Sequence, residues 1–591
     1  MCGIVGAVGK IDVRKFLIEG LYALDYRGYD SAGVAFIKDG QFFVKKQVGR
    51  VEALDKSVDK NIDAHIGIGH TRWATHGEPS ESNCHPHFSS KEEFGIIHNG
   101  VIENYRSLKT RLIENGFTFY SETDTEVVAN LLEYHYRKNK DVLDAIRRCI
   151  DDLKGSFAIA ILHKGEEDKL YFMKRSSPMF VTTVDGSGLL ASDAVPMIKY
   201  TNKFVDLRDN EYGVLYADKI DLFYGYNKIE PHFVKQNPEL LNRELGNYPH
   251  FMLKEIEETP EIITRLVDNY FDGEKFLFEP KMLDAIRKCD NVIFLACGTS
   301  YHAALKGVRY MHYLGKRSEA YIASEWAYFP VFTSKKPLYI LISQSGETAD
   351  LIRCQKIINS RGSVNIAITN TKGSSLDREA TFTCLLFAGL EVAVASTKAY
   401  SAQVALLAML TGAIEKRNNV TQHLIVLNQT LKDIIARKAE IENMALEIIK
   451  AKNIFFIGRG NDYDAALEAS LKMKEITYIH SEAFPGGELK HGPIAIVDKD
   501  TKLVAFNSDM STDLVIRNNV QEIEARGAKS FIISYKPLYK EGDAFSINYV
   551  KGYLSTIPMV FVAQYLAYYV AFHKGVDIDK PRNLAKSVTV E

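Results

Sequence analysis

The feature that most restricts the fold is a repeated strand–turn–helix pattern in the second half of the chain. Residues 292–305 (VIFLACGTSYHAAL) align with residues 454–467 (IFFIGRGNDYDAAL), sharing a glycine, a tyrosine and the closing Ala-Ala-Leu. Two short matches follow in the same order: Ala323-Ser-Glu325 with His480-Ser-Glu482, and Asp350-Leu351 with Asp513-Leu514. Matches in register across three successive units indicate a duplication more than a chance similarity.

Around and between these repeats, short apolar strands alternate with helical segments, the pattern of a parallel sheet covered by helices. We expect one α/β domain at 281–420, a second at 443–580 and a C-terminal tail at 581–591. The most membrane-like run, Ile557–Phe572, contains a glutamine and three tyrosines. It is shorter than the roughly 18–20 residues needed to span a bilayer. A buried helix is therefore predicted there, and no membrane partner is expected.

The first part of the chain, residues 1–238, has many short apolar strands, such as Ile4–Val8, separated by glycines and polar turns. Few helical segments interrupt them, and one of these is predicted to begin with Asp124 as its N-cap. This pattern predicts antiparallel sheets packed between helices, an α+β domain. A polar segment at 239–280, with a helix near Pro260–Asn269, is expected to link the two halves.

Composition excludes several classes of protein. The seven cysteines are odd in number and none is spaced as C-x-x-C, which argues against a disulfide framework and favours the reducing cytoplasm. The N-terminus has no basic segment typical of a secretory signal. A net charge of -2 gives no reason to expect a nucleic-acid partner. His85 and His87 lie near Cys84, but no second ligand group has suitable spacing, so no metal and no other cofactor is expected.

Cys2 directly follows the initiator methionine. After removal of that methionine, Cys2 would carry both a thiol and a free α-amine with a pKa of about 8. Such an amine can accept the thiol proton and later return a proton to a leaving group, so one residue supplies nucleophile and base. A cysteine at position 2 is weak evidence by itself, and its surroundings decide its interpretation.

Four segments downstream place polar side chains and glycines at the ends of predicted strands, where sites tend to form. They are Tyr26-Arg-Gly-Tyr-Asp-Ser-Ala-Gly33, His70-Thr-Arg-Trp-Ala-Thr-His-Gly77, His98-Asn-Gly-Val-Ile-Glu-Asn104 and Ser121-Glu-Thr-Asp-Thr-Glu126. Each segment alone could be an ordinary turn. Asn99-Gly100, for example, is a common dipeptide in β-hairpin turns. Together with Cys2, they resemble the N-terminal-nucleophile, or class II, glutamine amidotransferases.

That resemblance implies L-glutamine as the first substrate and a role for each matching residue. Cys2 would attack the side-chain amide, while the Asn99 side chain and the Gly100 N–H would form the oxyanion hole. Arg72 would bind the substrate carboxylate and Asp124 its ammonium group. The remaining implied residues line the glutamine pocket (Trp73, Thr75 and His76) or support the nucleophile (Arg27 and Asp30).

In the second half, residues 338–348 (LYILISQSGET) form an apolar strand, a hydroxyl-rich turn and the start of a helix. Backbone N–H groups at a helix start, together with Ser and Thr hydroxyls, suit a phosphate monoester; a solvated helix cap is the alternative. Residues 296–300 form a similar turn one strand earlier, so both turns are expected at the same sheet edge. The counterpart in the second repeat, Asn507–Thr512, lacks the glycine and carries an acid. One sugar-phosphate site per chain is therefore expected.

The two α/β units resemble sugar isomerase (SIS) domains, a resemblance that includes Glu391–Ala399, Gly487–Pro493 and Pro581–Glu591. It implies fructose 6-phosphate as the acceptor of the ammonia and glucosamine 6-phosphate as the product. The implied phosphate ligands are Ser300, Ser343, Gln344, Ser345 and Thr348. The residues implied to contact the sugar chain are Val394, Ser396 and Ala585.

The same resemblance implies that Lys586 forms a Schiff base with the sugar ketone and that Glu475 moves a proton between C1 and C2. His491 would help to open the sugar ring. Glu468 and Lys472 share a helix face with Glu475 and are expected to support it. Without the resemblance, a lysine near the C-terminus, a helix glutamate and a loop histidine would each be interpreted as solvated residues.

Coupling of the two halves requires a shielded path, because ammonia released into water would become ammonium. Sugar binding is expected to order the C-terminal tail, with Trp73 as a gate. The resemblance also implies a homodimer through the SIS domains, with His491 serving the neighbouring subunit. Two alternative functions fit the sequence less well. A phosphoribosyl or aspartyl acceptor site lacks its typical loops here, and a sugar-sensing protein would not need Lys586, Glu475 and His491 together.

Overall fold

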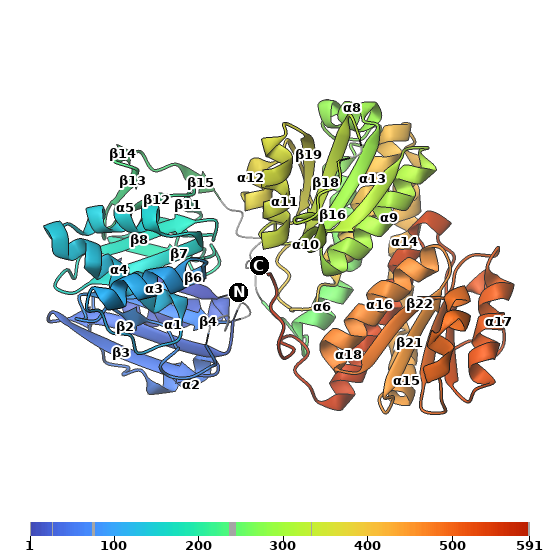
Figure 1. Ribbon diagram of the computed structural model, residues 1–591. Coiled ribbons are helices and arrows are strands. Elements are labelled where there is room, and N and C mark those ends of the chain that lie inside the picture. Colours follow the sequence, from blue (N-terminus) through green and yellow to red (C-terminus); the bar gives the residue numbers. More distant parts are fainter. Residues whose placement is uncertain (1, 26–27, 74–76, 236–243, 333, 589–591) are drawn as a thin grey trace. The chain divides into compact units, whose positions relative to one another are not determined.

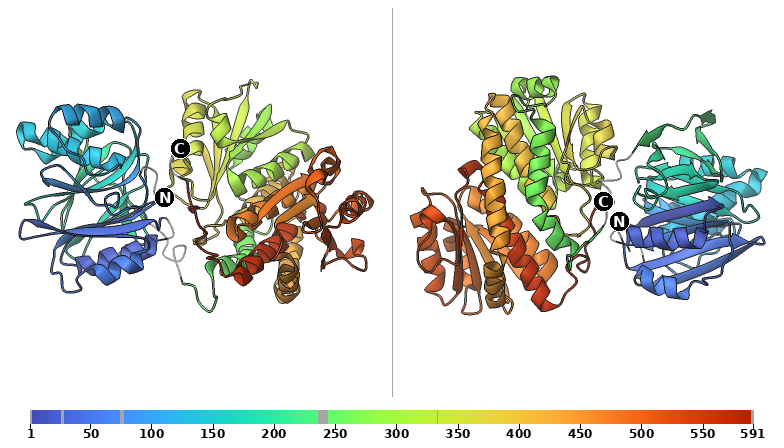
Figure 2. Two further views of the ribbon diagram at one scale, coloured as in Figure 1. Left: turned by 60° about the horizontal axis from the view of Figure 1, so that its bottom comes forward. Right: turned by 180° about the vertical axis from the view of Figure 1, so that it is seen from behind.

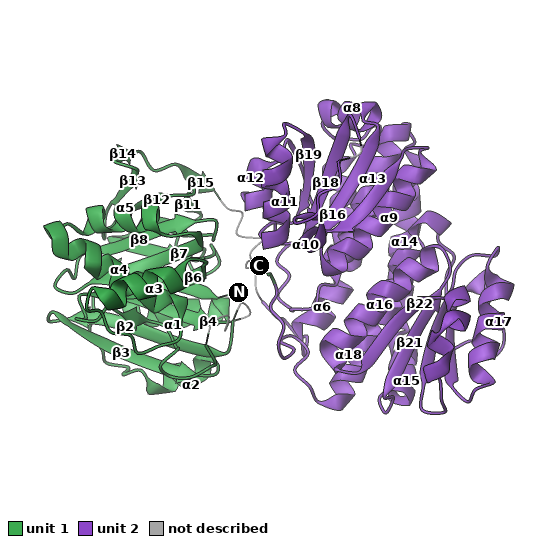
Figure 3. Cartoon of the chain, viewed as in Figure 1, with its two compact units in different colours: residues 1–242, 587–591 green, residues 243–586 purple. Residues whose placement is uncertain are grey.

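The computed structural model describes residues 2–25, 28–73, 77–235, 244–332 and 334–588. The chain divides into two compact units, residues 1–242 with 587–591 and residues 243–586 (Figure 3). Each unit has its own sheets and its own buried apolar clusters.

The first unit contains two antiparallel sheets (Figure 1). The eight-stranded sheet has the order β15 (Phe233–Lys235), β11 (Lys203–Asp206), β9 (Phe180–Val184), β10 (Ser187–Ala191), β1 (Gly3–Gly9), β4 (Ile66–Arg72), β2 (Ser31–Lys38) and β3 (Gln41–Val48). The seven-stranded sheet has the order β14 (Asn227–Ile229), β13 (Ile220–Tyr224), β12 (Glu211–Leu215), β8 (Leu170–Arg175), β7 (Gly155–His163), β6 (Phe94–Ile102) and β5 (His87–Phe88).

The two sheets pack face to face, with apolar side chains such as Ile4, Ile68 and Ile97 buried between them. Helices α1 (Val13–Leu24) and α2 (Val51–Ser57) bury apolar residues against the eight-stranded sheet. Helices α3 (Tyr105–Glu114), α4 (Asp124–Asn139) and α5 (Val142–Asp152) do the same on the seven-stranded sheet. The resulting helix–sheet–sheet–helix layers confirm the predicted α+β class.

The start of α4 corrects one expectation. Thr123, and not Asp124, is the N-cap residue, because the Thr123 hydroxyl accepts the backbone N–H of Glu126. Asp124 is the first residue of the helix. Its carboxylate is therefore turned to another partner, the backbone N–H of Ile102 on β6, at 2.8 Å.

The second unit contains two parallel sheets, and the second repeats the strand order of the first. The first sheet has the order β17 (Ser318–Ile322), β16 (Asn291–Ala296), β18 (Pro337–Ser343), β19 (Val364–Thr369) and β20 (Phe382–Leu385). The second has the order β22 (His480–Pro485), β21 (Asn453–Gly458), β23 (Lys502–Asn507), β24 (Lys529–Tyr535) and β25 (Phe545–Ile547).

Helices pack on both faces of each parallel sheet, as the two views of Figure 2 show. They are α8 (Pro280–Lys288), α9 (Gly298–Tyr313), α10 (Ala323–Trp326), α11 (Ala349–Ser360), α12 (Ser375–Glu379), α13 (Lys398–Glu415), α14 (Asn419–Ala436), α15 (Lys438–Ile448), α16 (Asn461–Thr477), α17 (Asp513–Glu524) and α18 (Thr556–Lys574). Short 3₁₀ turns include η2 (Gly486–His491) and η3 (Pro493–Ile496). One continuous apolar core joins both sheets.

Strand register refines the predicted repeat. Val292 pairs with Ser318, and the equivalent Ile454 pairs with Ser481. The counterpart of Ser481-Glu482 is thus Ser318-Glu319 on β17. The sequence alignment matched Ser481-Glu482 with Ser324-Glu325 instead. That match is wrong, because Ser324 and Glu325 lie in α10, the element after β17.

The segment expected as a linker contains two helices, α6 (Phe251–Glu257) and α7 (Thr259–Tyr270). Their side chains Met252, Ile256 and Ile263 are buried in the core of the second unit. The predicted buried helix is α18. Within the described residues it belongs to the single helical segment long and apolar enough to cross a membrane, and the apolar window of that segment is entirely buried inside the unit.

Candidate active sites

Cys2 immediately precedes β1, whose partner β4 ends at Arg72. The backbone N–H of Trp73, the next residue, donates to Cys2 Sγ at 3.2 Å. Burial raises the pKa of the Cys2 thiol, and this hydrogen bond opposes the shift only in part. The thiol is therefore protonated at neutral pH and needs a base before it can attack a carbonyl carbon.

Asn99 and Gly100 lie on β6, beside the nucleophile. Asn99 Nδ2 donates to the backbone oxygen of Cys2 at 3.0 Å, and Asn99 Oδ1 accepts from His70 Nε2 at 3.2 Å. Gly100 has a φ of +126°, and a Cβ there would lie 2.1 Å from the carbonyl oxygen of Ser156. Only glycine therefore fits at this position.

Arg72, Asp124 and Asp30 lie near this pair. Arg72 is buried, and its Nη2 donates to the Gly77 carbonyl at 3.0 Å. The Asp30 backbone N–H donates to the Arg72 carbonyl at 3.0 Å. The rings of Trp73 and Tyr29 meet edge to face, with centroids 5.8 Å apart. Arg27, Thr75 and His76, which the sequence also predicted here, lie outside the described residues.

A group of buried histidines next to Asn99 was not predicted. His70 stacks on His85, with ring centroids 4.0 Å apart, and His85 meets His87 at 4.8 Å. Burial lowers the pKa of His70 to about 3, so its ring is neutral, with Nε2–H donating to oxygen acceptors. Among the described residues, no group of three or more His, Cys, Asp or Glu side chains is arranged to hold a metal ion.

The hydroxyl-rich turn of the second unit follows β18 directly. Ser343 Oγ and Thr348 Oγ1 lie 2.8 Å apart, and Ser345 Oγ accepts the Glu347 N–H at 3.2 Å. Gly346 has a φ of +69°, and a Cβ there would lie 2.1 Å from Ser374 Oγ. This glycine lets the turn close tightly before Thr348, the N-cap residue of α11.

The second predicted turn, residues 296–300, follows β16, which lies next to β18 in the sheet. β16 pairs with β18, with Ala296 beside Ile342, so the two turns meet at one sheet edge as expected. Ser300 lies in the first turn of α9, and its hydroxyl accepts from Gln403 Nε2 at 3.0 Å. Ser300, Gln344 and the hydroxyls after β18 are therefore gathered where two helices begin.

Lys586 is paired with a buried acid that the sequence did not single out. Lys586 Nζ lies 2.5 Å from Glu391 Oε2, and both side chains are nearly inaccessible. Burial alone would raise the pKa of Glu391, but Lys586 and backbone donors outweigh burial and hold that pKa below its usual value. The Ser396 hydroxyl also donates to Glu391 Oε2, at 3.0 Å. The sequence signal for Glu391 is its acidic side chain within a segment of mostly apolar and small residues.

A second buried acid supports the same loop. Glu255 on α6 accepts the backbone N–H groups of Val392 and Ala393. Burial and the negative charge of Glu391 raise the pKa of Glu255 to about 8. Glu255 therefore holds the loop that carries Glu391 largely as a protonated acid at neutral pH. Only its tertiary contacts distinguish it from an ordinary helix glutamate.

Glu468, Lys472 and Glu475 share one face of α16, as predicted. Lys472 Nζ lies 2.5 Å from Glu475 Oε2 and 3.5 Å from Glu468 Oε1. Glu468 also accepts from Thr299 on α9, at 3.0 Å, and its other oxygen lies 2.7 Å from His302 Nδ1. Burial raises the pKa of Glu475, and the Lys472 charge offsets that shift only in part. The α16 residues thus connect the two parallel-sheet domains.

The other predicted sugar residues have different surroundings. The Val394 N–H donates to the Asp579 carbonyl at 2.9 Å, which ties this loop to the C-terminal segment. Ala585 is half-buried beside Lys586 in the chain. His491 ends η2 and is exposed.

Two family models match the chain. One described as a glutamine amidotransferase domain covers residues 70–199, and one described as an SIS domain covers residues 285–413 and 447–574. Curated relatives bear the name glutamine–fructose-6-phosphate aminotransferase [isomerizing]. The relative from Geobacillus kaustophilus is 43% identical and that from Oceanobacillus iheyensis 42% identical, with 100% of both chains covered in each case.

A solved structure also resembles the chain. It is the C-terminal domain of glucosamine-fructose-6-phosphate aminotransferase from Francisella tularensis, at 33% identity and a TM-score of 0.53. The match covers 57% of this chain and 100% of that one.

Proposed function

The chain belongs to the glutamine–fructose-6-phosphate aminotransferase (isomerizing) family, and on that premise we propose which residues carry each step. The chain converts fructose 6-phosphate and L-glutamine to glucosamine 6-phosphate and L-glutamate. The two units divide this reaction into release of ammonia from glutamine and its transfer to the sugar.

Cys2 is the nucleophile of the first step. Its α-amine, freed by removal of Met1, takes the thiol proton, and the thiolate attacks the glutamine side-chain amide. The Asn99 amide, whose oxygen is held by His70, and the Gly100 N–H stabilise the resulting oxyanion. The observation that best supports this assignment is the hydrogen bond from Asn99 Nδ2 to the Cys2 backbone oxygen, at 3.0 Å, next to a thiol that accepts the Trp73 N–H.

Around the nucleophile, Arg72 binds the substrate carboxylate and Asp124 its ammonium group. Trp73, Thr75 and His76 line the same pocket. Arg27 and Asp30 support the segment that carries the nucleophile, and the contact of Asp30 with the Arg72 backbone is consistent with that role.

The test is Cys2→Ala in the full chain. We expect it to abolish glutamine hydrolysis and glutamine-dependent synthesis, yet to leave synthesis from fructose 6-phosphate and ammonium chloride intact. Cys84→Ala is the matched control, since Cys84 is another buried cysteine of the same unit. Mass spectrometry of active protein that still carries Met1 would contradict the proposed base.

In the second unit, Ser343, Ser345, Thr348, Gln344 and Ser300 bind the phosphate. These groups lie where α9 and α11 begin, and helix N-termini favour an anion. Val394, Ser396 and Ala585 contact the sugar chain. The nearby Lys586 would then face the sugar end that carries the ketone.

Lys586 Nζ attacks C2 of the open-chain ketose once its proton has passed to a base, for which the paired Glu391 is the nearest candidate. Loss of water gives the Schiff base, and ammonia then displaces Lys586. Glu475 removes a proton from C1 and delivers one to C2, which converts the ketose imine to the aldose amine. The raised pKa of Glu475 makes it a stronger base than an exposed glutamate. Lys472 and Glu468 position it.

We further propose a cytoplasmic homodimer through the SIS domains, with no cofactor. His491 opens the sugar ring in the site of the neighbouring subunit. This role is consistent with its position, since it is exposed at the end of η2 within one chain. All seven cysteines are free thiols, which agrees with a reducing compartment. Mixing His491→Ala with Lys586→Ala subunits tests the arrangement, and recovery of activity in the hybrid is the expected result.

A further inference from the structure

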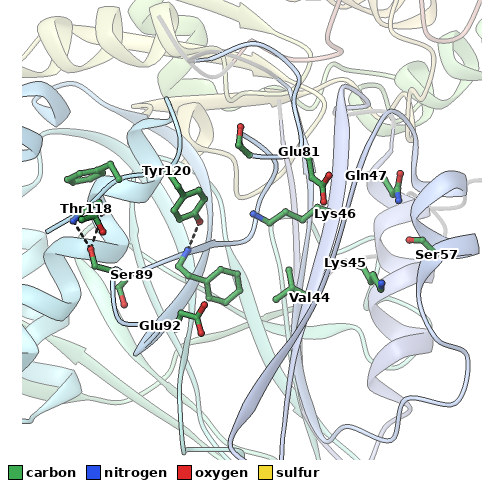
Figure 4. Close-up of a pocket in the computed structure, with 14 residues that line it drawn as sticks. Val44, Lys45, Lys46, Gln47, Ser57, Glu81, Ser89, Glu92, Thr118 and Tyr120 are labelled. Carbon is green, nitrogen blue, oxygen red and sulfur yellow. Dashed lines mark hydrogen bonds between the residues drawn. The ribbon is translucent and has the colours of Figure 1, made fainter.

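A pocket of about 830 Å³ opens on the first unit, apart from the residues assigned above (Figure 4). Its walls come from β3, from residues 81–82 and 88–92, and from residues 118–120 before α4. Pockets for small organic ligands typically have volumes of about 300–1,000 Å³. The space is therefore large enough for a metabolite.

One wall of the pocket combines an apolar surface with a cation. Along β3, the half-buried residues Phe42, Val44 and Lys46 alternate with exposed ones and share one strand face. Phe42 and Val44 pack with Phe88, and the Phe42 and Phe88 rings lie 5.0 Å apart. The same strand face thus carries the Lys46 ammonium group next to the apolar cluster of Phe42, Val44 and Phe88.

The Lys46 side chain extends from β3 across the pocket toward Tyr120, as Figure 4 shows. Its Nζ lies 5.6 Å from the centroid of the Tyr120 ring. Within the described parts of the chain, this ammonium forms no hydrogen bond and no ion pair. Burial lowers the pKa of Lys46 to about 8, and the nearby carboxylates of Glu81 and Glu126 oppose this shift. A partly desolvated cation without a close anion is a suitable partner for an anionic ligand.

The remaining charges restrict that anion. Glu81 and Glu92 line the same pocket and offset the charges of Lys45 and Lys46, so a monoanion fits better than a dianion such as a phosphate monoester. A single carboxylate can pair with Lys46, while a flat apolar body contacts Phe88 and Tyr120. Hydrogen-bond donors on the ligand would meet Glu81 or Glu92.

The pocket is also connected to the glutamine site by hydrogen bonds. The Tyr120 hydroxyl accepts the Phe88 N–H at 2.9 Å and lies 3.2 Å from His87 Nδ1. His87 Nε2 lies 3.1 Å from the hydroxyl of Thr123, which caps α4 just before Asp124. A ligand that moves the Tyr120 ring would therefore shift the start of α4.

We propose that this pocket binds a small organic monocarboxylate with a flat apolar body, and that its occupation changes glutamine binding through Tyr120 and His87. The binding part is independent of the roles assigned above. The coupling part rests on the proposed function, because it acts through Asp124 as the ligand of the substrate ammonium group.

The binding test uses 4-hydroxybenzoate as probe and equilibrium dialysis against the full chain at pH 7. We expect saturable binding that Lys46→Met weakens at least ten-fold, while the control variant Lys60→Met, at an exposed lysine of the same unit that does not line the pocket, leaves it unchanged. The neutral 4-hydroxybenzyl alcohol should bind at least ten-fold more weakly. Affinity should fall between pH 7 and 9 as Lys46 loses its proton. Absence of saturable binding, equal binding by Lys46→Met, or equally strong competition by inorganic phosphate overturns the proposal.

The coupling test measures KM for glutamine with and without saturating 4-hydroxybenzoate. We expect a several-fold change of KM with little change of kcat in the unsubstituted chain. In Tyr120→Phe, which keeps the ring but removes the hydroxyl, the probe should still bind and KM should no longer respond. A KM that ignores bound probe overturns the coupling. Failure of Cys2→Ala to abolish hydrolysis would instead count against the proposed function and leave the binding result intact.

Discussion

The two SIS domains share one strand order but place different polar groups at equivalent positions. In the first domain, Ser300 opens α9 and lies beside the hydroxyl-rich turn after β18. In the second, the repeat alignment puts Asp462 at the position of Ser300. The Asp462 carboxylate accepts the backbone N–H of Ser508 at 2.8 Å and its hydroxyl at 2.5 Å.

This difference explains how one fold acquires two tasks after duplication. In the second domain, the internal carboxylate of Asp462 occupies the N–H and hydroxyl donors of Ser508, in the turn after β23. In the first domain the equivalent position is Ser300, which has no carboxylate to place in the corresponding turn. Conversely, α16 carries Glu468, Lys472 and Glu475 where α9 carries lysine and tyrosines. On the proposed assignment, the first domain binds the phosphate and the second, with the C-terminal tail, supplies the chemistry.

The largest effect should come from the tail. Lys586→Met removes the amine that we propose forms the Schiff base, so synthesis of glucosamine 6-phosphate should fall on the order of 10³-fold or more. Glutamine hydrolysis should remain measurable. Lys551→Met is the control, since Lys551 is an exposed lysine of the same unit. Coupled assays of glucosamine 6-phosphate and glutamate measure both activities. Normal synthesis by Lys586→Met would show that the C-terminal tail does not supply the reacting amine.

The second-largest effect on synthesis should come from Glu475, in the second SIS domain. Glu475→Gln keeps the shape of the side chain but removes the base, so kcat for synthesis should fall roughly 10²–10⁴-fold. KM for fructose 6-phosphate should change little, because the proposed phosphate ligands lie in the other domain. Glu482→Gln, on the neighbouring strand β22, should have no effect. A Glu475→Gln variant altered in KM alone would break the proposed division of labour.

The phosphate turn allows a matched comparison, because Thr348 and Thr512 both precede a helix at the same place in the two domains. Thr348→Val removes one hydrogen bond to a charged phosphate and should raise KM for fructose 6-phosphate about 10–100-fold. Thr512→Val should leave KM unchanged. Equal effects of both substitutions on steady-state kinetics would show that the second domain also binds the phosphate.

The smallest effect concerns the internal carboxylate. Burial raises the pKa of Asp462 to about 6, from a usual value of 3.8. The folded state therefore binds more protons than the unfolded state between these values, and the free energy of unfolding should fall as pH rises from about 4 to 6. Asp462→Asn lacks this dependence and should gain about 1–2 kcal/mol relative to the parent chain across that window. Urea unfolding at several pH values measures it, and parallel curves for both proteins would contradict it.

Several site residues could be predicted because their signal is local. Cys2 beside the first strand, Asn99-Gly100 within β6 and the hydroxyls between β18 and α11 each lie in one short segment of the sequence. Glu391, Glu255 and the histidines around His70 could not, since their partners are distant in the chain. Lys586 reaches Glu391 across 195 positions, and Glu255 is distinguished only by the loop whose N–H groups it accepts.

The sequence alone determined the alternation of strands and helices and the duplication, and it supplied the proposal of Cys2 as nucleophile. These follow from side-chain periodicity and from the intrinsic chemistry of single residues. The proposed role of Lys586 came from the family resemblance. Tertiary structure alone decided the N-cap of α4, the register of β22 and the filling of the second anion position by Asp462. Those outcomes depend on which distant groups are buried together, and burial sets both the hydrogen-bond partners and the charge state of a polar side chain.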